Sequence, residues 1–202
     1  MLKSSIVLLT LTAFLSTIHV LPAAPEVGKP APEFSLTDTQ GTSHKLSDFK
    51  GKMVVLEWIN HECPFVKKFY GPGKMQEWQS KWTSQDVVWL SICSSNTGKQ
   101  GYLSNEDWNK KTAEVGAKAT AVLIDTDGTV GKLYDAKTTP HMYVINPEGV
   151  LIYAGAIDSI KSTSSDDIAK AVNYVDQALT EAKAGKAVSV STSPAYGCSV
   201  KY

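Results

Sequence analysis

A cysteine followed by a proline marks the point where an apolar segment gives way to an amphipathic one. Cys63 and Pro64 lie within Glu57-Trp-Ile-Asn-His-Glu-Cys-Pro-Phe-Val66. Residues 54–56, just before this segment, predict a strand buried on both faces, and helical spacing begins after it. Proline suits the first position of a helix, because its missing N–H costs nothing there. Unpaired backbone N–H groups and the helix dipole favour a thiolate at such a place. The pattern therefore predicts a reactive or metal-ligating cysteine at position 63.

Two titratable side chains precede this cysteine. Glu57 falls in the middle of the apolar strand, where burial would raise the pKa of its carboxyl group and make it a candidate general base. The alternative is a surface position on an edge strand. His61 can hydrogen-bond Cys63 or accept its proton, and the alternative there is an ordinary loop histidine.

The chain has three cysteines, and in an oxidising compartment an odd number predicts one disulfide and one free thiol. Cys93 ends a stiff apolar segment, whereas Cys198 lies in a polar and flexible C-terminal segment that can fold back. Disulfide geometry tolerates only a narrow range of separations. We therefore expect Cys63 to pair with Cys198 and Cys93 to stay free. The alternative is that Cys198 is merely an exposed thiol.

Composition is that of one ordinary globular domain. The chain has 202 residues, is 43% hydrophobic, and balances 20 basic against 20 acidic residues. This neutral balance argues against nucleic-acid binding and against electrostatic attachment to a membrane. All of the basic residues are lysine, and there is no arginine.

The N-terminus is typical of a signal peptide. Lys3 supplies a positive charge, residues 6–18 are apolar but too short to span a bilayer, and small residues follow at Ala23 and Ala24. We expect a signal peptide over residues 1–23 and export to the periplasm or outside the cell. A retained anchor is the alternative. Residues 24–186 then form the folded domain, and residues 187–202 form a tail that carries Cys198.

Strand and helix patterns alternate along the domain. Two short strands within residues 26–51 are expected to form a hairpin with its turn at residues 38–41. Gly71-Pro-Gly73 must break or kink the helix that follows Cys63. Later strands are predicted at residues 87–92, 121–124, 142–145 and 150–153. The order predicts an α/β fold whose mixed sheet is parallel in its first half and is flanked by helices.

A last helix is predicted near the end of the domain. Ser164 or Ser165 can cap its start, and Gly185 ends it. Its apolar stripe is Ile168, Val172, Val175, Leu179 and Ala182.

The chain resembles the redoxin family of thioredoxin-fold proteins, also called the alkyl hydroperoxide reductase/thiol-specific antioxidant family. More closely, it resembles the secreted, peroxiredoxin-like members. The motifs that carry the resemblance are Gly28-Lys-Pro-Ala-Pro-Glu-Phe34, Leu46-Ser-Asp-Phe-Lys-Gly-Lys52, Cys63-Pro-Phe-Val66 and Thr138-Thr-Pro-His-Met142. The resemblance implies a thioredoxin-like fold with an N-terminal β-hairpin extension.

The resemblance also implies roles for individual residues. Pro140 matches the cis-proline that faces the reactive cysteine, and Thr139 before it would present its backbone to an extended substrate. Glu57 matches the buried acid of thioredoxins, which assists proton transfer. The substrate would be a protein or small-molecule thiol or disulfide, an external thiol would serve as reductant, and no cofactor is expected.

Two departures narrow the expected chemistry. Val66 stands where a dithiol oxidoreductase has its second cysteine, so the local Cys-x-x-Cys mechanism cannot operate. Asn60 stands where peroxiredoxins have threonine, and the arginine that holds their peroxide is absent. Peroxidase activity is therefore expected to be weak.

These observations predict an exported thiol-disulfide oxidoreductase in which Cys63 is the nucleophile and Cys198 the resolving partner. The rival hypothesis is a periplasmic copper-binding or copper-delivery protein that uses Cys63 with His61 and His141. A scaffold that has lost catalysis is a third alternative.

Overall fold

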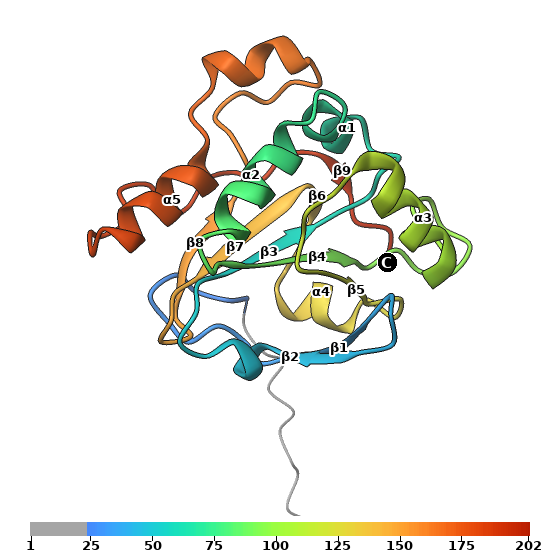
Figure 1. Ribbon diagram of the computed structural model, residues 1–202, viewed down its shortest axis with the longest axis horizontal. Helices are drawn as coiled ribbons and strands as arrows, with labels where there is room; N and C mark the ends of the chain where they lie inside the picture. The colour runs from blue at the N-terminus through green and yellow to red at the C-terminus, as the bar shows by residue number, and fades with distance from the viewer. Residues whose placement is uncertain (1–23) are drawn as a thin grey trace, which may run out of the picture.

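A seven-stranded mixed sheet forms the centre of the computed structural model, which describes residues 24–202 (Figure 1). The predicted signal peptide, residues 1–23, lies outside the described residues. The strand order is β2-β1-β5-β4-β3-β7-β8. The three central strands, β3 (Val54–Trp58), β4 (Val88–Cys93) and β5 (Ala121–Ile124), are parallel. The outer strands pair antiparallel: β1 (Ser35–Asp38), β2 (Ser43–Lys45), β7 (His141–Ile145) and β8 (Leu151–Gly155). The predicted α/β class and N-terminal hairpin are confirmed.

Helices cover both faces of the sheet. In Figure 1, α1 (Pro64–Tyr70), α2 (Lys74–Thr83) and α5 (Tyr174–Lys183) lie above it, and α4 (Thr129–Leu133) lies below. The remaining helices are α3 (Asn105–Val115) and two short 3₁₀ helices, η1 (Leu46–Phe49) and η2 (Ser165–Lys170). Side chains alternate along β3, so that Val54, Leu56 and Trp58 enter one core and Val55 enters the other. Burial on both faces explains why the sequence of this strand is apolar throughout.

Local sequence sets the ends of the helices around the site. The break predicted at Gly71-Pro-Gly73 separates α1 from α2, and Gly73 adopts the left-handed conformation (φ 81°) that glycine tolerates best. Ser104 caps α3 by accepting a hydrogen bond from the backbone N–H of Asp107 at 3.1 Å.

The last helix begins later than its apolar stripe predicts. Ser164 caps only η2, and α5 starts at Tyr174 with Asn173 as its cap. Between them the chain is extended, because Ser159 hydrogen-bonds the backbone of Val172 through both its N–H and its side chain. Val172 is consequently 51% exposed and does not belong to the stripe. Tertiary hydrogen bonds outweigh helical periodicity over these few residues.

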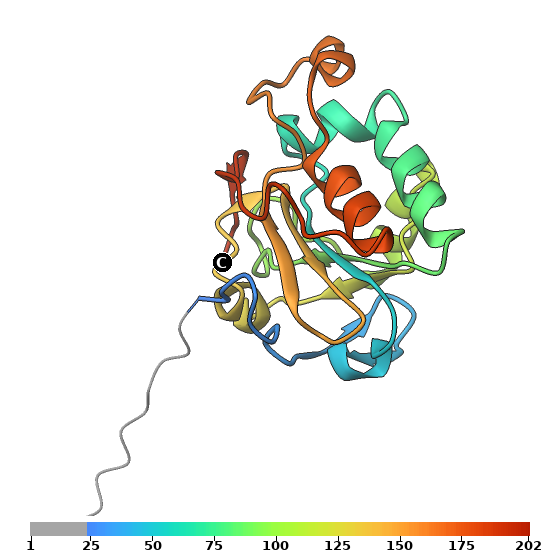
Figure 2. The same cartoon turned by 90° about the vertical axis from the view of Figure 1, so that its left-hand side faces the viewer.

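The C-terminal tail is folded against the domain, although its composition predicts flexibility. After α5 the chain runs along the edge strand β8 and ends beside α4 (Figure 2). Backbone hydrogen bonds join Ala154 of β8 to Ser191 and Ser193. Further on, β9 (Cys198–Ser199) pairs with β6 (Thr138–Thr139) in an antiparallel ladder. Edge strands leave backbone groups free for pairing, and the tail uses them.

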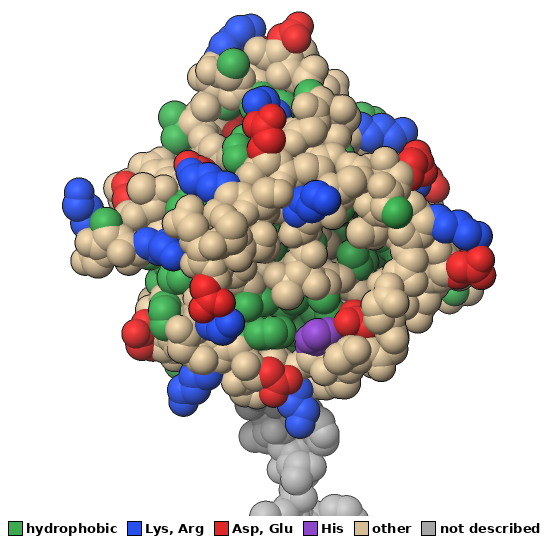
Figure 3. Space-filling view, viewed as in Figure 1, with side chains coloured by type: hydrophobic (Ala, Val, Ile, Leu, Met, Phe, Trp, Pro, Cys, Tyr) green, Lys and Arg blue, Asp and Glu red, His purple; other side chains and the backbone are tan. Residues whose placement is uncertain are grey.

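The surface carries no dominant charge on the face that Figure 3 shows, where lysine and acidic side chains are interspersed. Within residues 24–202, no helix is both long enough and apolar enough to span a membrane.

Candidate active site

Cys63 lies at the start of α1, in the loop that leaves the central strand β3. It is the N-cap residue, and Pro64 occupies the first helical position as predicted. The loop is shaped by Asn60, which is 1% exposed and accepts the backbone N–H of Glu62 on its side chain at 2.9 Å. The backbone carbonyl of Asn60 accepts the N–H of Cys63 at 3.0 Å. The residue that replaces the peroxiredoxin threonine thus folds the loop and directs the cysteine.

The sulfur of Cys63 has two close neighbours. The sulfur of Cys198 is 2.7 Å away, and the backbone oxygen of Thr139 is 3.0 Å away. β6 and β9 produce this arrangement, because Thr139 is directly opposite Cys198 in their ladder. The peptide bond between Thr139 and Pro140 is cis. The structure therefore brings together four of the residues that the sequence singled out: Cys63, Cys198, Thr139 and Pro140.

The two sulfurs have opposite protonation preferences. Burial raises the pKa of the Cys63 thiol, but hydrogen bonds from the Cys198 thiol and from the Cys198 and Val66 backbone outweigh burial and lower the pKa below its usual value. Burial and the neighbouring Cys63 raise the pKa of Cys198 to about 11. The two shifts favour the thiolate at Cys63 over the thiolate at Cys198. A thiolate is the form that attacks a substrate disulfide, and a second cysteine beside it can then resolve the mixed disulfide.

Glu57 is fully buried, which excludes the surface alternative. It faces the α1–α2 layer, and burial raises the pKa of its carboxyl group. Four side chains donate hydrogen bonds to it: Trp89 at 2.8 Å, Tyr70 at 3.0 Å, Ser91 at 3.2 Å and Gln79 at 3.3 Å. None of these donors is a cysteine. Glu57 organises the core beside the site, and its part in proton transfer stays a prediction.

The two histidines considered for the site are held by other partners. His61 packs against Tyr70 and Trp108, and burial lowers its pKa to about 4. Burial also lowers the pKa of His141 to about 4, and the Nδ1 atom of this ring lies 3.1 Å from the Tyr143 hydroxyl. In the part of the chain that the structure describes, no three His, Cys, Asp or Glu side chains gather in a way that could hold a metal ion. The three ligands of the copper hypothesis are therefore not assembled.

Sequence reasoning missed a buried polar network that anchors the tail. The Lys68 side chain on α1 is fully buried, and its Nζ atom lies 2.7 Å from the Asp158 carboxylate and 3.2 Å from the Tyr196 hydroxyl. Tyr196 also donates a hydrogen bond to Asp158. Lys67 and Lys68 are adjacent on α1, and nothing in the sequence indicates that Lys68 is buried. The only available hint was an aromatic residue two positions before Cys198.

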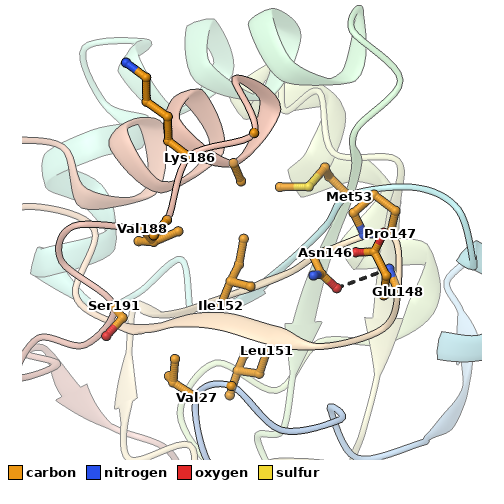
Figure 4. Close-up of a pocket in the computed structure, with 14 residues that line it drawn as sticks. Val27, Met53, Asn146, Pro147, Glu148, Leu151, Ile152, Lys186, Val188 and Ser191 are labelled. Atoms are coloured by element: carbon orange, nitrogen blue, oxygen red, sulfur yellow. Dashed lines mark hydrogen bonds between the residues drawn. The ribbon is translucent and has the colours of Figure 1, made fainter.

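A separate hollow of about 450 Å³ lies at the opposite end of β3 (Figure 4). Met53, Ile152 and Val188 line it together with the turn after β7, where Asn146 accepts the N–H of Glu148 at 3.2 Å. Its lining includes no cysteine or histidine. The groups with redox chemistry are gathered at the Cys63 end of the sheet.

The sheet, the cysteine at the start of a helix and the cis-proline opposite it define a thiol protein of the thioredoxin-like class. Residues 27–154 match the model of the AhpC/TSA family. The chain therefore belongs to the AhpC/TSA family.

Relatives and solved structures agree with this assignment. The chain is 30% identical over 125 residues to the thiol-disulfide oxidoreductase ResA of Bacillus subtilis, an alignment that covers 62% of this chain and only 64% of that protein. The ResA of Geobacillus kaustophilus is 28% identical over 159 residues, covering 73% and 82%. Neither relative is named a peroxiredoxin.

Two solved structures show the fold. An uncharacterized conserved protein from Geobacillus kaustophilus superposes with a TM-score of 0.74 at 27% identity, over 88% of this chain and 92% of that one. The thioredoxin domain of a thiol-disulfide oxidoreductase from Bacteroides vulgatus superposes with a TM-score of 0.51 at 20% identity, over 73% and 98%. The predicted thioredoxin-like fold is confirmed.

Proposed function

We propose that this chain is an exported thiol-disulfide oxidoreductase in which Cys63 is the nucleophile and Cys198 is its resolving partner. The observation that carries the proposal is the 2.7 Å contact between the two sulfurs, with the pKa lowered at Cys63 and raised at Cys198. The names of the ResA relatives, which describe this chemistry, support it.

The reaction is balanced without a cofactor. The Cys63 thiolate attacks one sulfur of a substrate disulfide, and the other substrate sulfur leaves as a thiolate. Cys198 gives its proton to the substrate thiolate released in the first step and attacks the Cys63 sulfur of this mixed disulfide, which releases the remaining substrate thiolate. Cys63 and Cys198 are then joined in a disulfide, and two electrons have passed to the substrate. An external thiol reductant restores both cysteines.

Cys198 thus replaces the second cysteine of the Cys-x-x-Cys motif. Val66 occupies that place on α1 and is 1% exposed in the core. A thiol 135 positions away in sequence takes over through the β6–β9 ladder. The substrate class is a protein or small-molecule disulfide, and the compartment follows from the predicted signal peptide.

The resemblance to peroxiredoxin-like proteins does not extend to peroxidase activity in this proposal. The Asn60 side chain accepts a hydrogen bond from the Glu62 backbone within the loop, and the chain has no arginine to polarise a peroxide. Consumption of hydrogen peroxide with a general thiol reductant should be slow. Turnover at the rate of dedicated peroxidases would contradict this part of the proposal.

The central test is disulfide exchange of three single variants with a small chromogenic aryl disulfide, and the reduced thiol is added only after the first reaction has been recorded. Cys63→Ser should abolish exchange, because the nucleophile is gone. Cys198→Ser should stop at a mixed disulfide on Cys63 that is visible by mass spectrometry. Cys93→Ser is the matched control and should behave as the wild type. Full exchange in Cys63→Ser, or its loss in Cys93→Ser, would overturn the assignment.

A further inference from the structure

The tail does more than deliver a thiol, because it docks as an extended strand over the nucleophile. Cys63 is 0% exposed, and the strand that carries Cys198 is packed against it. Thr138 pairs with Ser199 and Thr139 with Cys198, and the ladder continues where Lys137 accepts the N–H of Val200 at 3.1 Å. Any substrate of Cys63 must first displace this strand. The place that it vacates is a backbone edge that accepts another extended chain.

Tyr196, two residues before Cys198, is buried in a pocket formed by its contacts with Phe65, Lys68 and Asp158. Its ring meets Phe65 edge-on, with 5.7 Å between centroids, and its hydroxyl is bonded to Asp158 and lies 3.2 Å from Lys68. The pocket is therefore built for an aromatic ring with a hydrogen-bonding tip. Its floor is a fully buried ion pair, which a ring without a hydroxyl would leave less satisfied.

Gly197 lies between Tyr196 and Cys198, and the close approach of the tail to the Thr139 backbone requires a glycine there. Its φ of +153° is a conformation that other residues rarely adopt. A Cβ atom built on it would stand 2.1 Å from the backbone oxygen of Thr139, and backbone cannot move aside as a side chain can. The residue before the cysteine must therefore lack a side chain.

We infer that the tail is an internal copy of the substrate, and that the preferred substrate is an extended polypeptide carrying the sequence Tyr-Gly-Cys. This inference rests on the proposed function and specifies its substrate class. The tail and the substrate compete for the β6 edge, and the tail returns with Cys198 to release the product. An attached tail competes at a high effective concentration, so that it also limits access to Cys63.

The test uses the full chain with Cys198→Ser and a synthetic peptide of residues 193–200, whose cysteine is joined by a disulfide to an aryl thiol. Attack by Cys63 on the peptide sulfur releases the coloured aryl thiolate and leaves the peptide on Cys63. Matched peptides replace the glycine by valine or the tyrosine by alanine. We expect both to react at least about tenfold more slowly, a loss of about 1.4 kcal/mol in transition-state binding.

The same substitution placed in the protein should have the opposite effect. Gly197→Val, added to Cys198→Ser, should expel the tail from β6 and accelerate attack on the unmodified peptide. If that variant is unstable, Tyr196→Phe removes only the hydroxyl contact and should give a smaller acceleration. Circular dichroism and a melting curve establish that each variant is folded.

The outcomes separate the two proposals. Equal rates for all three peptides, with Cys63 still reacting with a small aryl disulfide, would overturn the substrate inference and leave the proposed function standing. Absence of any adduct at Cys63, even with the small disulfide and the tail expelled, would overturn the proposed function itself. Slower peptide attack in Gly197→Val than in the parent would show that the tail is not a competitor.

Discussion

Cys63 and Cys93 follow neighbouring parallel strands and emerge at the same end of the sheet, yet their surroundings give them opposite chemistry. Cys63 starts a helix and faces a second thiol, and its pKa is lowered. Cys93 ends β4, donates a hydrogen bond to the Gly101 carbonyl at 3.6 Å, and burial raises its pKa. Both are almost completely buried. The comparison teaches that the balance between burial and hydrogen bonds to the sulfur sets the pKa: the hydrogen bonds outweigh burial at Cys63, and burial outweighs them at Cys93.

The largest expected difference between the two cysteines is in disulfide formation. Oxidation should join Cys63 to Cys198 and leave Cys93 free. The bond closes a loop that spans 135 positions, which stabilises the chain by about 4–5 kcal/mol, less any strain. The oxidised protein should melt on the order of 10 °C above the reduced one in calorimetry.

Two variants serve as controls for this melting difference. Cys198→Ser should remove most of it, and Cys93→Ser should preserve it. A disulfide-linked Cys63–Cys93 peptide in a digest of the oxidised protein would contradict the predicted pairing of Cys63 with Cys198.

The next effect concerns thiol reactivity. In the reduced protein at about pH 6, iodoacetamide should label Cys63 at least about tenfold faster than Cys93. A lowered pKa leaves more thiolate at any pH below the usual value of 9.0, and a raised pKa leaves less. The exposed fractions of 0% and 3% give neither thiol an advantage in access. Mass spectrometry of the labelled peptides measures the ratio, and unfolding the protein should abolish it.

Glu57 lies on β3 opposite Ser91 of β4, on the strands that lead to the two cysteines. Its raised pKa means that the folded state binds the proton more tightly. Its contribution to the unfolding free energy is complete below the usual pKa of 4.5 and declines as pH rises through the folded value. Glu57→Gln should therefore gain stability relative to the wild type as pH increases.

The same variant tests the role of Glu57 in proton transfer. If Glu57 is the general base, Glu57→Gln should slow exchange at Cys63 by about 100-fold or more, whereas a purely structural carboxyl held by core side chains would change the rate by less than about twofold. A loss of that size in folded Glu57→Gln would assign Glu57 to the chemistry of Cys63.

The smallest effect is expected at His61. Its pKa of about 4 keeps the ring neutral through the physiological range, so the pH profile of Cys63 reactivity should show no inflection near the usual histidine pKa of 6.5. His61→Phe retains an aromatic ring against Tyr70 and Trp108 and should leave that profile unchanged. If the wild-type pH profile shows such an inflection and His61→Phe does not, His61 accepts a proton from Cys63.

Much of the site could be predicted because its signals are local. The apolar residues of β3 and Pro64 placed Cys63 at the start of a helix, and the resemblance to the redoxin family implied the cis-proline at Pro140. The last helix was predicted too early, since Ser159 holds Val172 in an extended conformation. That contact joins residues 13 positions apart, which helical periodicity does not register.

The sequence by itself determined the strand and helix order and the family, and it singled out Cys63 as the candidate nucleophile, because burial patterns and turn residues act over a few positions. It also predicted Cys198, rather than Cys93, as the partner of Cys63. Only the tertiary structure decided how that partner is held. The docking of the tail depends on the β6–β9 ladder and on the buried contact of Lys68 with Asp158 and Tyr196, groups 90 and 128 positions away along the chain. Lys68 can be buried only because folding brings the Asp158 carboxylate to it. The sequence does not indicate which of its acidic residues will form this ion pair.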